Sequence, residues 1–580
     1  MIHALINIGK ACVDRYPEPL VEVPYTSWKE GKEPKVLVVE LQHESSGKLA
    51  TIADYSIDDA VSKYMFRDPK TAQGPAASLS FKLPETPKVL RQRLGILDLL
   101  GYSADVEEIA KFIESEIEKL RESGSLAKNA QVLIVLKVDG TWPSQNRVLQ
   151  NKFKSEFFKR LGLYGKKPVW EVTSICHGCG KKTKVYGGVG NLLKFYTVDK
   201  HGYAPELNPK VAWKQYALCE DCIFDLERGK RAKDDFLTWQ FYGKGFWLLP
   251  VSTGNLRNVL DRFKQFHDES SGKAHKEGYE SLEDRLLYEA ANQEEAISYH
   301  FVFAQKDNQA LRIKLHIEEV LPSVLKEYVN MKREFEDGVK DFVNEVPIPF
   351  KFNFNFFSSK NLKATNQKPG FTDEDFYMLV DKVFRRSPVG ERYLISKAMS
   401  RITKDMAEVG EQGGLPWWSV LETLFSLELL LKWGILKREI GGVDMSGLPY
   451  EEFFKKHKDF FNHPSIRALI LLGVLVQKFL DYQYSQRDST PFLKVLKNLK
   501  LDQKDVQSIF AKLQNKMNEY NIGHWWPELR EGISLNFIEA GERWPLSPDE
   551  VGFYIAVGMA LHSHPIFGKS RSEGEGSENE

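Results

Sequence analysis

Four cysteines in two close pairs are the residues whose spacing most clearly indicates chemistry. Cys176 and Cys179 stand in "ICHGCGKKTK", and Cys219 and Cys222 stand in "YALCEDCIF". Each C-x-x-C pair can present two thiolates to one ion, and two pairs complete a tetrahedral four-sulfur shell. Such a shell leaves no coordination position for a reacting water, so the spacing predicts a structural zinc ion.

Disulfide-bonded or free cysteines are the alternative to a zinc site. Disulfides would require an oxidising compartment, and neither alternative explains the paired spacing. The 39 residues between the two pairs make this module longer than a compact zinc ribbon. We expect this segment to fold as short strands and turns, and we expect the fifth cysteine, Cys12, to be an ordinary buried thiol.

Basic residues are concentrated around the cysteine pairs. Residues 166–233 contain thirteen Lys or Arg and seven Asp or Glu, whereas the whole chain has 80 of each sign. A general polycation is therefore excluded, and any nucleic-acid surface must be local. The excess could contact phosphates or could be a solvated surface, and charge alone leaves both open. The candidate contacts are Lys181, Lys182, Lys184, Lys194, Lys200, Lys214, Arg228, Lys230 and Arg231.

Motifs for catalysis are largely absent from the sequence. The glycine-rich "YGGVGN" lacks the lysine of a phosphate-binding loop. His267 and Asp268 form an isolated pair, without the further His and Asp ligands that a metal nuclease needs. No paired aspartates stand ready to hold the two metal ions of a polymerase. We therefore expect a protein that is not an enzyme.

Length and composition indicate a globular protein of several domains. With 580 residues, of which 42% are hydrophobic, the chain can form three or four cores. The first residues lack the basic and apolar regions of a signal peptide. The longest strongly apolar run, residues 468–476, is too short to cross a bilayer. We expect a cytoplasmic, soluble protein without a membrane partner.

The front of the chain predicts an α+β fold that includes the cysteine module. Strand-length β-branched runs occupy residues 35–42 and 131–138, and helical periodicity marks residues 87–101 and 105–123 between them. After the cysteine pairs, "YGKGFWLLPVS" predicts a strand leaving a glycine turn. Residues 299–317 predict a β-hairpin that turns at Asp307 and Asn308.

An alternating aromatic segment follows the predicted hairpin. In "PFKFNFNFF" the rings of Phe350, Phe352, Phe354 and Phe356 would share one face of a strand. Aromatic side chains exposed on a sheet can stack nucleic-acid bases. Buried aromatic side chains are the more common occupants of such a face, so we expect it to belong to the core.

The back of the chain predicts a helical bundle. From Phe371 onward almost every segment has helical periodicity, and Thr372 is the expected N-cap of the first helix, with Asp375 in its first turn. Cations that could give this bundle a positive side are Arg487, Lys494, Lys497, Lys500 and Lys504.

These patterns together predict five parts. They are an N-terminal α+β domain (1–165), a zinc-binding module with basic flanks (166–260), a hairpin-containing α+β region (261–370), a C-terminal helical bundle (371–567) and a disordered tail (568–580). The tail has too few apolar residues to pack against the rest of the chain.

Several of the motifs together resemble one known family. "CHGCGKKTKVYG", "KFYTVDKHGY", "AWKQYALCEDCIFDLERGK", "FWLLPVS" and "LRIKLHIEEVLPS" are similar to the large subunit of type I-B CRISPR surveillance complexes, known as Cascade. The segment "STPFLKVLKNLKLDQKDVQSIFAKLQNKM" resembles the C-terminal helical part of that subunit. The resemblance extends from "NIGKACVDRY" to about Tyr520, nearly the whole chain.

The resemblance implies a noncatalytic subunit at the 5′ end of the crRNA. Members of the family recognise the motif beside the target, help to open duplex DNA and support a recruited helicase–nuclease, while base pairing supplies sequence specificity. Their helical C-terminal domain resembles the small subunit of the complex. In the family the small subunit is often made separately, from an internal start within the large-subunit gene. In this chain Met378, Met399 or Met406 would provide such a start. The alternatives are a zinc-knuckle RNA-binding protein outside CRISPR and, less favoured, a zinc-containing nuclease.

Overall fold

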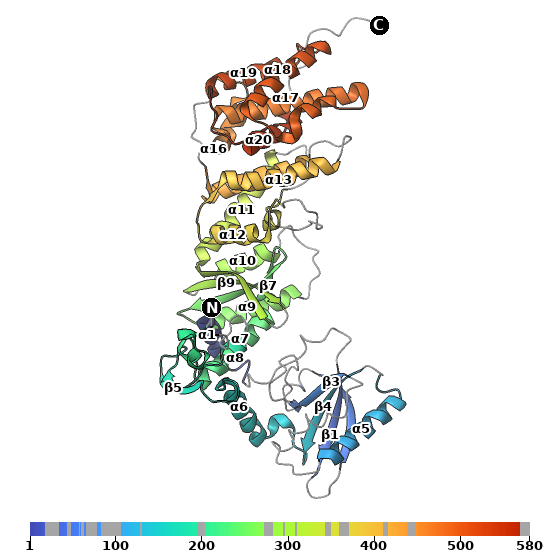
Figure 1. The fold of residues 1–580 in the computed structure, drawn as a ribbon, viewed down its shortest axis with the longest axis vertical. Coiled ribbons are helices and arrows are strands. Elements are labelled where there is room, and N and C mark those ends of the chain that lie inside the picture. Colours follow the sequence, from blue (N-terminus) through green and yellow to red (C-terminus); the bar gives the residue numbers. More distant parts are fainter. Residues whose placement is uncertain are drawn as a thin grey trace. The chain divides into compact units, whose positions relative to one another are not determined.

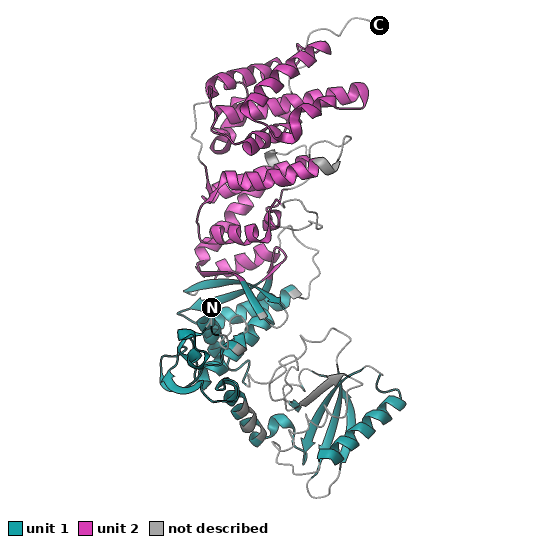
Figure 2. Cartoon of the chain, in the orientation of Figure 1, with its two compact units in different colours: residues 1–239, 246–274, 295–313 teal, residues 240–245, 275–294, 314–580 magenta. Residues whose placement is uncertain are grey.

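The computed structural model describes most of the chain. The described residues are 1–17, 34–42, 48–56, 59, 63–64, 78–82, 106–127, 130–193, 201, 204–271, 282–293, 296–307, 310–342, 350–358, 370–409, 416–438 and 447–568. They form two compact units, the first with residues 1–239, 246–274 and 295–313 and the second with residues 240–245, 275–294 and 314–580 (Figure 2). The predicted helix at 87–101, Lys194, Lys200 and residues 569–580 of the predicted tail lie outside the described residues.

A four-stranded mixed sheet contains both strands predicted near the N-terminus. Its order is β2 (Lys48–Asp54), β1 (Lys35–Leu41), β4 (Gln131–Val138) and β3 (Ser78–Lys82). Strands β1 and β4 are parallel, with Val38 opposite Val135, and their apolar side chains are almost fully buried. Helix α5 (Val106–Glu122) is the predicted second helix of this region, and its Glu108 pairs with Lys48 of β2.

Helices α1 (Ile2–Ala11) and α8 (Glu220–Phe236) pack together through two glycines. A Cβ added to Gly229 would lie 1.9 Å from the carbonyl oxygen of Leu5, and one added to Gly9 would lie 1.7 Å from that of Asp225. Only glycine therefore allows the two backbones to approach this closely. The N-terminal helix is thus fixed on the helix that carries the second cysteine pair.

The middle of the chain forms a second sheet, with strand order β10-β9-β8-β7. Its strands are β7 (Thr238–Phe241), β8 (Lys244–Ser252), β9 (Ile297–Asp307) and β10 (Ala310–Val320). The predicted hairpin strands β9 and β10 are neighbours, and the strand predicted after the glycine turn is β8, which follows Gly243 at φ +77°. Helix α9 (Leu256–Ser271) follows β8.

The second unit is mainly helical from α11 onward, which confirms the predicted fold class of an α+β front and a helical back (Figure 1). Its helices are α10 (Leu282–Ala291), α11 (Pro322–Phe342), α12 (Asp373–Phe384), α13 (Glu391–Val409), α14 (Trp417–Lys432), α15 (Glu451–Lys456), α16 (Lys458–Phe461), α17 (Pro464–Arg487), α18 (Gln503–Glu519), α19 (Pro527–Ala540) and α20 (Pro548–Ala560). A parallel pair of two-residue strands, β11 (Val389–Gly390) and β12 (Leu436–Lys437), completes this part.

Helix α17 forms the centre of the C-terminal bundle. It packs against α19 and α20, and its apolar run from Ala468 to Val476 is completely buried. The crossing with α20 again needs glycine, because a Cβ on Gly473 would lie 2.1 Å from the carbonyl oxygen of Ile555. Among the residues described here, no helix is both long enough and apolar enough to span a bilayer.

The start of α12 agrees with its sequence signal. The Thr372 hydroxyl accepts a hydrogen bond from the backbone N–H of Asp375, and the Asp375 carboxylate accepts one from the backbone N–H of Thr372. This capping box satisfies two backbone donors at the helix start. The predicted N-cap at Thr372 is therefore confirmed.

The alternating aromatic segment is not a strand, so that part of the prediction is wrong. Residues 354–357 form a 3₁₀ turn, η7 (Phe354–Phe357), because the Asn353 side chain accepts from the N–H of Asn355 at 2.8 Å. The Glu336 carboxylate accepts from the N–H of Phe352, also at 2.8 Å. These local bonds replace a strand ladder. The rings are nevertheless buried, as predicted for a core.

The segment between the cysteine pairs also differs from its prediction. Among the described residues of this segment, which exclude 194–200 and 202–203, the one strand is β6 (Lys182–Tyr186), paired with β5 (Glu171–Ile175) just before the first cysteine. The other described elements are a short helix, α7 (Gly190–Leu193), and the 3₁₀ turns η5 (Pro205–Leu207) and η6 (Pro209–Lys214). Proline opens both turns, where its fixed φ suits a helical first position.

Candidate metal centre and basic surfaces

The first cysteine pair lies on the turn that joins β5 to β6. The backbone N–H of Cys176 donates to the carbonyl of Lys181 at 2.9 Å, and that of Gly180 donates to the carbonyl of Cys176 at 2.8 Å. Gly180 has φ +72°, a conformation that favours glycine. A Cβ on Gly178 would lie 2.8 Å from the sulfur of Cys222, so glycine also makes room for the second pair.

The second pair lies at the start of α8 and is held against the first by the main chain. Cys219 is the N-cap of α8, and Cys222 lies in its first turn. The N–H of His177 donates to the carbonyl of Ala217 at 3.0 Å, while its Nδ1 accepts from the Ala217 N–H at 3.1 Å. His177 therefore connects the two pairs and is engaged with the backbone.

The four sulfurs form one compact cluster that could hold a metal ion. All four lie within 4.8 Å of one another, and those of Cys179 and Cys219 are 3.8 Å apart. Four sulfurs placed tetrahedrally at about 2.3 Å from an ion are roughly 3.8 Å apart, which fits a tetrathiolate site. Cys176, Cys219 and Cys222 are 1%, 6% and 2% exposed, so three of the four cysteines are shielded from solvent, whereas Cys179 is exposed.

Backbone donors already favour a thiolate at Cys176. Burial alone would raise the pKa of this thiol, but the N–H groups of Cys219, Cys179 and Gly178 direct hydrogen bonds to its sulfur and lower the pKa to about 7. Burial raises the pKa of Cys219 to about 11 and raises that of Cys222 as well. A bound metal cation would stabilise negative charge on all four sulfurs, so that all of them could be thiolates at the same time.

The lysines beside the first pair differ in their surroundings. Lys181 and Lys182 are exposed, and no ion pair within the described residues involves either of them. Lys184 pairs with Glu171 at 2.8 Å, and this carboxylate, together with the Tyr186 hydroxyl, raises the pKa of Lys184. Lys214 pairs with Glu206 at 2.7 Å. Beside the first pair, therefore, Lys181 and Lys182 have no ion-pair partner among the described residues, whereas Lys184 has one.

The cations of α8 bind the N-terminal segment or neighbouring acids. Arg228 donates through Nε to the carbonyl of Tyr16 at 3.0 Å and pairs with Asp225, while Arg231 lies over the Tyr16 ring at 5.7 Å. Lys230 pairs with Glu227 at 2.8 Å. These contacts give Arg228 and Arg231 a structural role, and contact with nucleic acid stays a prediction for them.

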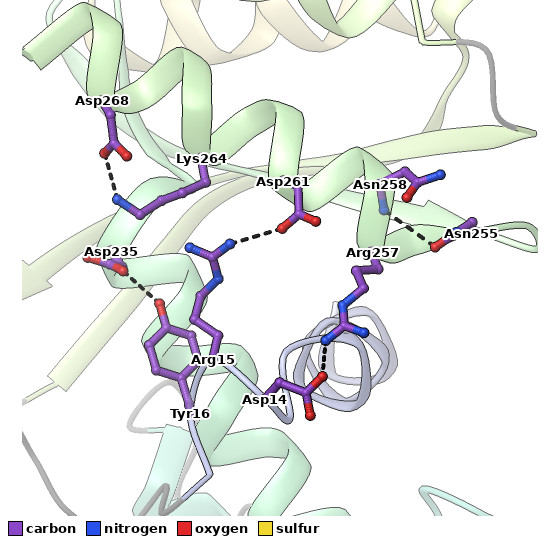
Figure 3. Close-up of polar contacts among 10 residues, drawn as sticks. All are labelled: Asp14, Arg15, Tyr16, Asp235, Asn255, Arg257, Asn258, Asp261, Lys264 and Asp268. Carbon is purple, nitrogen blue, oxygen red and sulfur yellow. Dashed lines mark hydrogen bonds and ion pairs between the residues drawn. The ribbon is translucent and has the colours of Figure 1, made fainter.

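Three consecutive residues after α1 fix this segment to α8 and α9 (Figure 3). Asp14 pairs with Arg257, Arg15 donates to Asp261 at 2.9 Å, and the Tyr16 hydroxyl donates to Asp235 at 2.6 Å. Cys12, just before them, is 4% exposed, and burial raises the pKa of its thiol to about 11. The fifth cysteine is thus a buried thiol, as predicted.

The basic residues predicted on the helical bundle are only partly available. Lys497 pairs with Asp505 at 2.5 Å, and Arg487 lies over the Tyr520 ring at 5.2 Å. Lys500 and Lys504 are exposed, and Lys494 is exposed on η8 (Pro491–Leu499). Whether these cations contact nucleic acid stays a prediction.

Two motifs considered for catalysis have structural explanations. In "YGGVGN", a Cβ on Gly187 would lie 2.7 Å from Trp213, and one on Gly188 would lie 2.5 Å from the carbonyl oxygen of Leu161, so these glycines permit close packing. Asp268 pairs with Lys264 at 2.6 Å, and within the described ranges it joins no cluster of three candidate ligands with His267.

Sequence reasoning missed a pocket beside the metal centre. Helix α6 (Arg147–Leu161) lines it with Lys154, Phe158 and Lys159, and α8 contributes Phe224. The spacing of Lys154 and Phe158 by four residues was a signal, because residues i and i+4 share a helix face. No helix was predicted at residues 147–161, and the sequence did not indicate which elements would pack against that face.

The fold and the site define an α+β protein of two compact units: the first carries a knuckle formed by Cys176, Cys179, Cys219 and Cys222, and the second is mainly helical. The model of the central domain of CRISPR-associated protein TM1802 matches residues 173–320, which include all four cysteines, and that of its C-terminal domain matches residues 352–573. The chain therefore belongs to the CRISPR-associated TM1802 family, the large subunit of type I-B complexes, as the resemblance predicts. No curated protein matches the chain.

Proposed function

We propose that this chain is a noncatalytic subunit of an RNA-guided DNA surveillance complex, in which it recognises the target-adjacent motif, helps to open target DNA and supports recruitment of a helicase–nuclease. Its partners are crRNA, the other Cascade subunits and double-stranded target DNA. The four cysteines hold one structural zinc ion. The family match supports the class of complex, and the close cluster of four sulfurs supports the metal site.

The observation that carries this proposal is the position of Lys181 and Lys182. Both follow the first cysteine pair directly and are exposed beside a turn that main-chain bonds fix. A cation on a rigid turn loses less conformational entropy on binding a phosphate than one on a mobile loop. Phosphate contacts of this kind supply sequence-independent affinity for DNA.

The experiment combines Lys181→Glu and Lys182→Glu in the assembled complex and measures binding of duplex target DNA over a range of salt concentrations. Because each lost phosphate contact reduces the slope of log K against log salt by about 1, we expect a slope smaller by about 2. Affinity should also fall by at least about tenfold at moderate salt.

A matched control combines Lys111→Glu on α5 with Lys326→Glu on α11, two exposed lysines outside the cysteine module. The control makes the same change in net charge. Because its two positions lie outside the proposed DNA-binding surface, it should leave the salt slope nearly unchanged. If the Lys181 and Lys182 variant keeps both the affinity and the slope in a fully assembled complex, these lysines do not contact DNA.

The noncatalytic role is supported by the composition of the cluster. Four thiolate ligands occupy all four coordination positions of a tetrahedral metal ion, which leaves no position for a nucleophilic water. Incubation of the purified chain with single- and double-stranded DNA and RNA, in the presence of Mg²⁺, Mn²⁺ or Zn²⁺, should give no cleavage. Metal-dependent cleavage that co-purifies with the chain and is lost in a site variant would favour the nuclease alternative.

A further inference from the structure

A pocket of about 520 Å³ lies between α6, the β5–β6 pair and α8, next to the metal centre. Its lining includes Lys154, Phe158 and Lys159 of α6, Lys184 and Tyr186 of β6, and Phe224 of α8. All of them belong to the first unit. The four-cysteine site does not use this surface, and none of the predicted sites except Lys184 lies in it.

Three aromatic rings form the floor of the pocket. The Phe158 ring lies 5.2 Å from that of Tyr186 and 5.3 Å from that of Phe224, so the three rings pack as one group. Phe158 and Tyr186 are almost fully buried, whereas Phe224 is partly exposed. Phe224 therefore offers an aromatic surface to a ligand, and the Phe158 ring packs against it.

Lysines surround this floor and lie over two of its rings. The Lys154 ammonium is 5.8 Å from the centre of the Phe224 ring, and that of Lys184 is 5.3 Å from the centre of the Tyr186 ring. Both acids in the lining are engaged, since Glu171 pairs with Lys184 and Glu220 accepts from the Tyr186 hydroxyl at 2.7 Å. Three lysines against two glutamates leave a positive pocket.

We propose that this pocket binds one nucleotide of a single-stranded nucleic acid, with the base against Phe224 and the phosphate between Lys154 and Lys159. An aromatic surface that accepts any base, combined with nearby cations for the backbone, is the usual chemistry of single-strand recognition.

The concave shape selects a single strand over a duplex. Bases inside a duplex are stacked on their neighbours and cannot enter a recessed pocket, whereas an unpaired base can. The proposal rests on the proposed function, because an RNA-guided complex contains both guide RNA and a displaced DNA strand. It assigns a separate surface to the single strand, distinct from Lys181 and Lys182.

The test measures binding of short oligothymidine and oligouridine to the purified full-length chain by fluorescence anisotropy. Combining Lys154→Glu with Lys159→Glu should weaken binding by at least about tenfold and reduce the salt slope by about 1.4, as expected for two contacts to a single strand. Phe224→Leu removes the aromatic surface but keeps an apolar side chain, and it should weaken binding by roughly tenfold. Phe224→Tyr should preserve it.

The matched charge control is the variant that combines Lys111→Glu with Lys326→Glu, and it should leave oligonucleotide binding intact. Zinc content, measured for every variant, reports whether the knuckle still folds. A second measurement uses the unaltered chain, in which a 5-iodouracil base cross-linked by light should attach to the peptide that contains Phe224 or Phe158. Cross-links found only outside α6 and α8 would overturn the proposal even if a variant failed to fold.

The outcomes separate this proposal from the proposed function. If the pocket variants lose binding to the DNA oligomer alone, the ligand is a displaced DNA strand. If they lose binding to the RNA oligomer alone, the ligand is the guide RNA. Equal loss for both oligomers fits the single-strand chemistry that DNA and RNA share. Unchanged affinity of the Lys154, Lys159 and Phe224 variants for both oligomers would refute the pocket, while the effect of Lys181 and Lys182 on duplex binding could still stand.

Discussion

The residues that position the cysteines matter as much as the four sulfurs. The Cys176 sulfur accepts from the N–H of Gly178 at 3.3 Å and from that of Cys219 at 3.2 Å. These bonds link the two pairs through the backbone and stabilise negative charge on the sulfur. Neighbouring amides thus orient the ligands, as groups outside the coordination shell do in many metal sites.

Zinc content of ligand and non-ligand variants tests the metal centre. Purified protein should contain about one zinc ion per chain, and Cys222→Ser should reduce this strongly, because the remaining three thiolates cannot complete the shell. Removal of the ion should also unfold the knuckle, since metal binding contributes folding free energy. Elemental analysis and protection from proteolysis measure the two effects.

Cys12→Ser is the matched control for the metal prediction, because Cys12 is similarly buried but lies at the C-terminal end of α1, outside the cluster. It should keep its zinc. A zinc content near zero in unaltered protein purified without a chelator would contradict a zinc site.

Asp375 gives a prediction with a pH dependence. Burial would raise the pKa of its carboxyl, but hydrogen bonds from Tyr393, Thr372 and Lys397 lower it below the usual value. A folded pKa below the unfolded one stabilises the fold above the unfolded value of about 3.9, and this stabilisation is lost as pH falls through the folded pKa. Asp375→Asn should therefore lower the free energy of unfolding by about 1–3 kcal/mol at pH 7.

Urea unfolding of the full chain at several pH values measures this difference, which should shrink as the pH falls below about 4. Glu374→Gln, an exposed neighbour in the same helical turn, is the control and should change stability much less. An Asp375→Asn effect that stays constant down to acidic pH would show that its charge is unimportant.

At the scale of elements, glycines determine how helices cross within each of the two units. Gly9 with Gly229 joins α1 to α8, and Gly473 with Gly558 joins α17 to α20. Glycine inside a helix costs about 1 kcal/mol relative to alanine, so the close approach must return more than this in packing. The N-terminal helix is consequently part of the structure that supports the cysteine knuckle.

Gly229→Ala tests the α1–α8 crossing. Helix propensity alone would stabilise α8 by about 1 kcal/mol, but the added methyl group would overlap the carbonyl oxygen of Leu5. Overpacking of this kind costs about 1–3 kcal/mol or more, so the net effect should be destabilising. Thermal unfolding and zinc retention measure it.

The control for this substitution is Gly338→Ala in α11, where no heavy atom lies within 4 Å of the added Cβ. It should be neutral or stabilise the chain by up to about 1 kcal/mol. If Gly229→Ala proves as stable as Gly338→Ala, the helices do not approach as closely as the structure indicates.

At the scale of the whole molecule, the C-terminal family match agrees with the packing of the second unit. The match begins at residue 352, within the aromatic segment whose Phe354 and Phe356 rings contact Phe376 of α12 and the adjoining Phe371. Within this match, α17 packs against α16, α18, α19 and α20, and α20 also packs against α13 and α14. The five predicted domain boundaries stay predictions.

The structure sharpens the prediction of a separate C-terminal product. Glu391 of α13 accepts from Tyr554 at 2.9 Å and pairs with Arg438 at 2.9 Å, and all three groups are nearly inaccessible to solvent. A start at Met399 or Met406 would remove Glu391 and leave Arg438 buried without this partner, which costs about 3–5 kcal/mol. A start at Met378 keeps Glu391 but loses the cap at Thr372 and the Asp375 carboxylate that accepts from Tyr393 and Lys397, which together cost about 1–3 kcal/mol.

We therefore expect a product that begins at Met378 to accompany the full chain in the natively expressed complex. Intact-mass analysis detects it, and Met378→Leu should abolish it without altering the full-length chain. Met399→Leu is the matched control and should leave the product in place. Complexes that contain only full-length chains would refute the internal start.

Local patterns in the sequence determined much of this protein. The cysteine pairs, the buried strands at 35–41 and 131–138 and the capping box at Thr372 depend on residues only a few positions apart, so spacing is sufficient to predict them. The motifs that carried the family resemblance are also local, and the family matches confirmed it.

Only the tertiary structure decided which cations remain available and where surfaces meet. Arg228 contacts Tyr16 from 212 positions away, and the pocket under Lys154 exists because α6 packs against β6 and α8. The aromatic segment alternates like a strand, yet Glu336 and Asn353 take its backbone donors into other bonds. Such outcomes depend on partners that are distant in the chain, and local spacing carries no information about where those partners lie.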